Sequence, residues 1–89
     1  MSKLQQSLDA GLFTFTGEVG PPKGVDLTHV IEGADAMKDK VAAINVTDIQ
    51  TAVMRLGSLA VSAKLVERGM EPVFQMVCRD RNRLALQSD

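Results

Sequence analysis

A single carboxylate stands at the end of the first strand-like run, directly before a turn rich in glycine and proline. Glu18 closes that run, and Gly20, Pro21 and Pro22 break the chain just after it. In parallel α/β folds this position lies at the C-terminal mouth of the sheet, where reactions take place. Burial of a carboxyl group in a partly apolar mouth raises its pKa, so Glu18 is a candidate general acid. Gly17 and Gly20 slightly favour a binding site at Glu18, because small neighbours let a flat ligand approach the backbone. A solvated strand-end residue explains the pattern at least as well.

Polar residues also mark the next two strand-like runs. Thr47 and Asp48 end the second run, where they can hydrogen-bond a ligand or cap the next turn, and their spacing favours capping. Gln75 lies between Phe74 and Met76 in an apolar run, so its amide needs a hydrogen-bond partner. That partner is a ligand or another part of the protein, and the pattern does not choose between them.

The apolar pattern predicts strands that alternate with helices. Strands are expected over residues 12–19, 41–47 and 72–78. Helices are expected over 3–10, from a cap at Asp26 or Thr28 to about residue 40, over 51–68 with Gly69 as C-cap, and onward from a cap at Asp80. Strands about 30 residues apart, with a helix between each pair, are typical of parallel βα units. The predicted fold class is therefore α/β.

Composition limits the kinds of protein and of site. The chain has 89 residues and a net charge of -1, which allows one small domain and gives no reason to expect a nucleic-acid or membrane partner. Cys78 is the single cysteine, so an internal disulfide is excluded and no metal site is expected. We expect Cys78 to be buried at a strand end. No apolar run is long enough for a signal peptide or a membrane span, and a cytoplasmic protein is expected.

The basic cluster at residues 78–83 contains one acid and no aromatic side chain. This composition favours a solvated helix start with internal ion pairs over an anion site or a nucleic-acid surface. Three parallel strands alone would also leave bare sheet edges, which proteins usually cover. The helical pattern continues up to Asp89, and a complete (βα)8 barrel needs roughly 250 residues. We therefore expect the chain to be a fragment of a larger domain.

Three ordered motifs at successive strand ends resemble one family. They are Glu-Val-Gly-Pro-Pro-Lys-Gly at 18–24, Ile-Asn-Val-Thr-Asp at 44–48, and Gln-Met-Val-Cys-Arg-Asp-Arg-Asn-Arg at 75–83. Together they resemble the methylenetetrahydrofolate reductase family. The resemblance covers nearly all of the chain but only about the first third of the family's (βα)8 TIM barrel. It implies that residues 1–89 form the N-terminal segment of such a barrel, with about three βα units.

The resemblance implies a flavin-dependent oxidoreductase of one-carbon metabolism and methionine biosynthesis. Members bind FAD, take a hydride from NADH or NADPH, and reduce 5,10-methylenetetrahydrofolate to 5-methyltetrahydrofolate. By resemblance, Glu18 is the general acid that protonates folate N10 and opens the five-membered ring, after which flavin N5 delivers the hydride. Thr47, Asp48, Gln50 and Gln75 match positions in segments that contact FAD or lie beside the flavin and nicotinamide.

The chain departs from the family pattern at several positions. Gly17, Val19 and Gly20 stand where many members carry aromatic residues around the acid, Asp48 where Tyr is common, and Gln75 where His is common. These departures fit a divergent bacterial branch that works with partner subunits or as a homo-oligomer. A non-catalytic α/β binding or assembly module stays open as an alternative, as does another barrel enzyme that handles a pterin or a methyl group.

Overall fold

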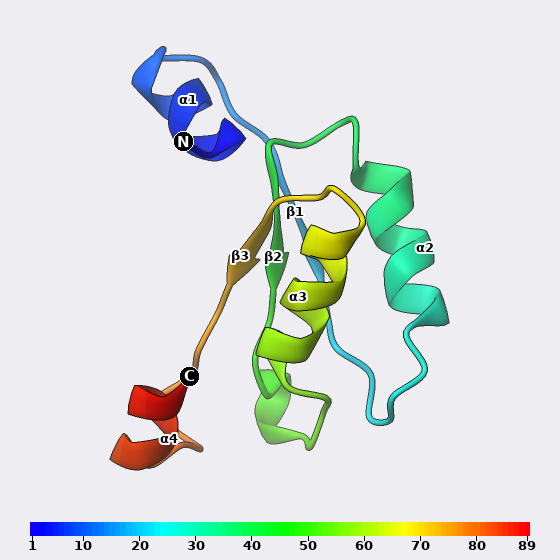
Figure 1. Cartoon of the computed structure of the whole chain (residues 1–89), viewed down its shortest axis with the longest axis vertical. Coiled ribbons are helices and arrows are strands. Elements are labelled where there is room, and N and C mark those ends of the chain that lie inside the picture. The colour runs from blue at the N-terminus through cyan, green and yellow to red at the C-terminus, as the bar shows by residue number, and fades with distance from the viewer.

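The computed structural model describes all of residues 1–89, as helices alternating with strands (Figure 1). The elements are α1 (Lys3–Asp9), β1 (Thr16–Val19), α2 (Thr28–Met37), β2 (Ala43–Val46), the 3-10 turn η1 (Gln50–Ala52), α3 (Ser58–Glu67), β3 (Pro72–Phe74) and α4 (Arg83–Ser88). The strands form one sheet in the order β1-β2-β3, and both pairs are parallel. The predicted α/β class and its parallel βα units are confirmed, and closure into a barrel stays a prediction. None of the α-helices has the length and apolar content needed to cross a bilayer.

The sheet has one covered face and one open face. Val19 pairs with Val46 across β1 and β2, and both side chains point into the core beneath α2 and α3, which lie on the same side of the sheet (Figure 1). Side chains alternate along a strand, so the neighbouring pair, Glu18 and Asn45, points to the opposite side. No helix packs against that side, which we call the open face.

The core fills the space between the covered face and the two helices. Its buried members are Val19, Ile44 and Val46 from the sheet, Val30 and Ala34 from α2, Val61 and Leu65 from α3, and Met70. The helix members lie four residues apart, so each pair occupies one stripe of its helix. A Cβ at Gly17 would stand 2.6 Å from the sulfur of Met37, so α2 approaches the β1 backbone closely. Gly17 therefore serves packing on the covered face and, contrary to expectation, does not open a ligand approach.

Helix α3 ends where predicted, although the C-cap is Arg68 and Gly69 occupies the next position, C′. Gly69 has φ of +76°, the left-handed conformation that favours glycine. Its N–H donates to the carbonyl of Val66 (2.9 Å), and the N–H of Met70 donates to the carbonyl of Leu65 (3.0 Å). This is a Schellman motif, and the two apolar residues that it brings together, Leu65 and Met70, are both buried in the core.

Helix α1 docks at the N-terminal end of the sheet. The carboxylate of Glu71, just before β3, accepts the N–H groups of Lys3 (2.7 Å) and Leu4 (3.1 Å) in the first turn of α1. Two backbone donors that the helix itself cannot pair are satisfied in this way, and the negative charge meets the positive end of the helix dipole. Partial burial raises the pKa of Glu71, but these backbone hydrogen bonds outweigh it, and the pKa is lowered overall.

Several predicted boundaries were wrong for identifiable reasons. The strands are shorter than predicted, and β3 ends early because the N–H of Val77 donates to the Asp48 carboxylate instead of to a neighbouring strand. The helix expected over residues 51–68 begins only at Ser58, because the N–H of Leu56 donates across the chain to the carbonyl of Pro22 (2.7 Å).

Helix caps were also misassigned at two places. Asn82, rather than Asp80, caps α4, with its side-chain oxygen accepting the N–H of Ala85 (2.9 Å). At α2 the N-cap position belongs to Leu27, which has no capping side chain. Asp26 nonetheless accepts the N–H of Thr28 (3.0 Å), the first residue of the helix. The Asp26 side chain therefore satisfies a backbone donor at the start of the helix, although Asp26 lies one residue before the N-cap position.

Candidate functional site

Glu18 lies near the C-terminal end of β1, on the open face. Its side chain is exposed, and it makes no hydrogen bond or ion pair within the chain. The partly apolar mouth that would surround it is therefore not built by these residues. In register, Glu18 stands beside Asn45 of β2. The structure thus presents the carboxylate to whatever adjoins the open face.

A ladder of side-chain amides crosses the open face beside Glu18. Asn45 donates through Nδ2 to the carbonyl oxygen of Gly17 (2.9 Å) and to Oγ1 of Thr16 (3.3 Å), both on β1. Its Oδ1 accepts from Nε2 of Gln75 (3.3 Å), which follows β3. Gln75 therefore has a partner within the chain, as its position in an apolar run requires. The three strands are joined on this face by side chains as well as by backbone.

A second polar pair lies at the end of β2. Thr47 is buried, and its hydroxyl donates to Oε1 of Gln50 in η1 (3.3 Å). A Cβ added at Gly20 would stand 3.6 Å from both of these oxygens. These are ordinary van der Waals distances, so Gly20, unlike Gly17, has room for a side chain. The ligand approach expected at Gly20 stays a prediction.

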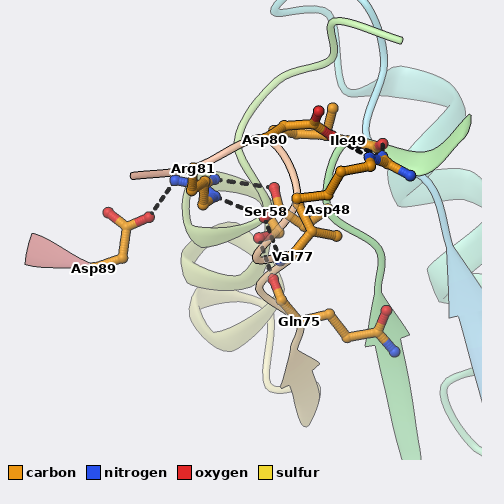
Figure 2. A network of polar contacts seen from close by, with 9 residues as sticks. Asp48, Ile49, Ser58, Gln75, Val77, Asp80, Arg81 and Asp89 are labelled. Atoms are coloured by element: carbon orange, nitrogen blue, oxygen red, sulfur yellow. Dashed lines mark hydrogen bonds and ion pairs between the residues drawn. The ribbon is translucent and has the colours of Figure 1, made fainter. Parts of the chain in front are cut away.

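Asp48 faces the other way and is the centre of a buried ion pair (Figure 2). Arg81 donates to both carboxylate oxygens, from Nε at 2.8 Å and from Nη2 at 3.0 Å. The Asp48 side chain is completely buried and that of Arg81 is 17% exposed. Arg81 also reaches Asp89 at 2.6 Å, so one guanidinium joins the end of β2 to the start and the end of the C-terminal segment.

This ion pair sets the electrostatics of Asp48. The Arg81 guanidinium, by hydrogen-bonding the carboxylate, holds the pKa of Asp48 below its ordinary value of 3.8. Burial opposes this effect, and the N–H of Val77 at 3.0 Å supports it. The Asp48 oxygens are thus used within the chain, and the residue supports the loop after β3 instead of facing a ligand on the open face.

The capping predicted for Thr47 and Asp48 was wrong. The residue before η1 is Ile49, which supplies no side-chain cap, while Thr47 and Asp48 bond the partners described above. Ile49, Thr51 and Ala52 all have positive φ, between 45° and 61°, which non-glycine residues seldom adopt. Such strained segments often occur at binding sites. Here the strained segment is the one that carries Gln50.

The charge cluster at residues 78–83 forms one of the internal ion pairs predicted for it, Arg79 with Asp80, whereas Arg81 is largely buried and pairs with Asp48 outside the cluster. Arg79 pairs with Asp80 at 2.7 Å and donates to the carbonyl of Ile49 at 3.2 Å, while Arg81 pairs with Asp48. Cys78, by contrast, is exposed and not buried as expected, because the chain leaves the sheet after Phe74. No group of three potential metal-binding side chains comes together.

The candidate site lies at the C-terminal edge of the sheet, where Glu18 and Gln50 are exposed, Gln75 is partly exposed, and Thr47 and Asp48 are buried. The larger cavity of the molecule, about 240 Å³, lies at the opposite end, where Lys3, Lys38 and Glu71 are among its lining residues. Sequence reasoning missed Asn45 and Arg81 as members of the arrangement. The signal for Asn45 was available, since it is an amide inside an apolar run just as Gln75 is.

Comparisons with protein-family models, with curated proteins and with solved structures found no match for this chain. The family resemblance therefore depends on the motifs at residues 18–24, 44–48 and 75–83 alone. It stays a prediction, and so do the activity and the cofactor that it implies.

Proposed function

We propose that this chain supplies the first βα units of a (βα)8 barrel that reduces 5,10-methylenetetrahydrofolate with FAD and NADH or NADPH. One observation carries the proposal. Glu18, Asn45 and Gln75 lie on the face of the sheet opposite the helices. In a TIM barrel the helices form the outer ring, so the open face is the one that would turn inward. The C-terminal edge, where Thr47 and Gln50 meet, is the end where barrel enzymes place their active sites.

The residues at this edge fit a flat, polar cofactor such as FAD. Two oxygens, from Thr47 and Gln50, lie beside Gly20, where an added Cβ would stand 3.6 Å from each. Thr47 and Gln50 would hold the polar edge of a ring, with Gln75 beside them on the open face. FAD, when bound, supplies the hydride that reduces the folate.

Glu18 is the proton donor in this proposal. In the completed barrel, the enclosed Glu18 carboxyl would donate a proton to N10 of the folate, which opens the five-membered ring and prepares the carbon for reduction. In a complete barrel, further strands and helices would enclose this residue, which is exposed here. Exclusion of water from the site would then keep the proton on Glu18 for transfer to the substrate.

Completion of the barrel requires additional strands at both edges of the sheet. β1 and β3 each have one side without a partner strand, and exposed parallel edges of this kind are normally covered. We propose that further βα units, in a longer chain, a second copy or a partner subunit, pair with these edges. The 89-residue chain alone is then expected to have no reductase activity.

The proposal is tested with Glu18→Gln in a protein that contains the completed barrel. The rate of folate reduction should fall by at least about 100-fold, because the amide of Gln cannot act as the general acid. Reduction of FAD by NADH or NADPH should stay normal, because it needs no proton from Glu18. Glu32→Gln, which changes an exposed carboxylate on α2, is the matched control. Normal folate turnover by Glu18→Gln would refute the assignment of Glu18.

A non-catalytic α/β binding or assembly module is the second candidate. The observation that favours it is that Glu18 lines neither cavity of the molecule: one, about 230 Å³, is lined by Val19, Gly20, His29 and Val30, and the other, about 240 Å³, lies at the opposite end of the sheet. The two candidates differ in a simple measurement. A completed protein that purifies with a flavin absorption spectrum and binds folate supports the reductase. A protein that takes up neither supports the module.

A further inference from the structure

The open face has at its centre a residue of the 44–48 motif to which the sequence assigned no role. Asn45, the partner of Glu18 in the sheet register, is hydrogen-bonded to β1 on one side and to Gln75 on the other. Its side chain is only partly exposed, and the apolar Ile44 and Val46 flank it in β2. An amide at the middle strand of a sheet can control the orientation of the side chains on both sides.

The orientation of Asn45 follows from an acceptor that cannot change its role. The backbone carbonyl of Gly17 can only accept, so the group 2.9 Å away from it must be the Nδ2 donor of Asn45. A flipped Asn45 would place two oxygens against each other at that distance. Oδ1 of Asn45 is therefore directed toward β3.

The orientation of the Gln75 amide follows in the same way. Oδ1 of Asn45 can only accept, so the atom of Gln75 that lies 3.3 Å from it must be the Nε2 donor. The backbone of Gln75 is fixed as well, because its N–H donates to the carbonyl of Val46 (3.3 Å) and its own carbonyl accepts from the buried Ser58 hydroxyl (2.7 Å). Figure 2 shows the Gln75 side chain directed away from the Asp48–Arg81 pair. What remains free is the Oε1 oxygen of the Gln75 amide.

We propose that Asn45 is a positioning residue that makes Gln75 present its carbonyl oxygen, and so selects a ligand group that donates an N–H at this point of the site. A heterocycle with a ring N–H beside a flat polar edge has the required chemistry. The inference rests on the proposed function, because it takes Gln75 as a residue that contacts the bound cofactor or substrate. Asn45 itself acts only through Gln75.

The first test examines the amides in the 89-residue chain, without any ligand. In NMR spectra the side-chain NH2 groups of Asn45 and Gln75 should show slowed hydrogen exchange. Asn45→Ala should return the Gln75 NH2 to the exchange rate of a free amide. A Gln75 NH2 that exchanges freely in the unchanged chain, or that is unaffected by Asn45→Ala, would overturn the positioning role.

The second test measures ligand affinity in the completed protein, with FAD and with 5,10-methylenetetrahydrofolate as probes. Asn45→Ala should lower the affinity for the probe that contacts Gln75 by about tenfold, the size of effect expected for one hydrogen bond. In a Gln75→Leu background, Asn45→Ala should cause no further loss, because its effect passes through Gln75. Gly69→Ala, a destabilising change at the other end of the sheet, shows whether lower stability alone weakens binding.

The outcomes separate this inference from the proposed function. If Asn45→Ala lowers the affinity equally in the unchanged protein and in Gln75→Leu, the positioning role is overturned and the reductase proposal is left intact. An unchanged protein that binds neither probe would overturn the reductase proposal and with it the ligand contact of Gln75. In that case the exchange rate of the Gln75 amide still decides whether Asn45 orients it.

Discussion

Replacement of Arg81 by Met should expose how much of the fold depends on one buried ion pair. Met keeps an apolar stem of similar length and removes both guanidinium hydrogen bonds to Asp48, at 2.8 and 3.0 Å. The Asp48 carboxylate would stay buried with the N–H of Val77 as its remaining backbone donor. The pair joins the end of β2 to the loop after β3, so its loss should loosen the C-terminal edge of the sheet.

The expected magnitude follows from burial. Hydrogen bonds to a charged group contribute about 1.5–3 kcal/mol each, and leaving a fully buried charge without its partner costs about 3–5 kcal/mol. Arg81 is 17% exposed, so water screens part of the interaction and the lower end applies. We expect Arg81→Met to lower the free energy of unfolding by about 3 kcal/mol at pH 7. A chain of 89 residues has roughly 4–13 kcal/mol in total, so this is a large fraction.

The pH dependence gives the prediction a definite sign. In the unchanged chain the pKa of Asp48 is lowered from 3.8, so its contribution is present above that value and is lost as pH falls through the lower folded-state pKa. In Arg81→Met, burial acts on Asp48 without the cation, so we expect its pKa to rise. Protonation would then remove the buried charge from the variant as pH falls through that raised pKa toward 3.8, and the difference in stability from the unchanged chain should narrow.

Urea unfolding followed by circular dichroism, at several pH values from 7 down to 4, measures both quantities. Arg83→Met is the matched control, since Arg83 is exposed and forms none of the ion pairs. If Arg81→Met fails to fold, the double variant Asp48→Asn with Arg81→Met should recover most of the loss, because no buried charge remains. A loss no larger than that of Arg83→Met, or a difference in stability that does not narrow by pH 4, would refute the reasoning.

Two further predictions concern the elements that support the site. Gly69→Ala should lower the free energy of unfolding by about 1 kcal/mol, because φ is +76° at this position. Gly33→Ala should raise the free energy of unfolding by about 0.5–1 kcal/mol, because Gly33 lies inside α2 with open space around it. Shifts of the same sign in urea unfolding would contradict this account. Glu71→Gln should weaken the docking of α1 by about 0.5 kcal/mol, because the charge at the helix start is lost. The Lys3 and Leu4 amide signals in NMR should titrate as pH falls below 4.5, in step with the lowered pKa of Glu71. In Glu71→Gln they should no longer titrate, and signals that behave alike in both chains would contradict the role given to Glu71.

Much of the fold could be predicted because its signals are local. Apolar runs at strand and helix spacing placed three strands and the helices between them, and Gly69 marked the end of α3 correctly. The boundaries failed where a distant partner took a backbone donor. Leu56 donates to Pro22 instead of within a helix, and Val77 donates to Asp48 instead of within the sheet. No local propensity reports such a competition.

The candidate site shows the same division. Polar residues at or near the strand ends could be recognised locally, because the apolar runs end at Glu18, Thr47 and Gln75 or close beside them. Which of these residues share a face depends on contacts between distant segments, so no local pattern reports it. Thr47 and Asp48 are neighbours in the chain, yet one bonds Gln50 beside Gly20 and the other is buried against Arg81. Asp48 and Arg81 lie 33 residues apart, and it is the parallel pairing of β2 with β3 that brings their segments together.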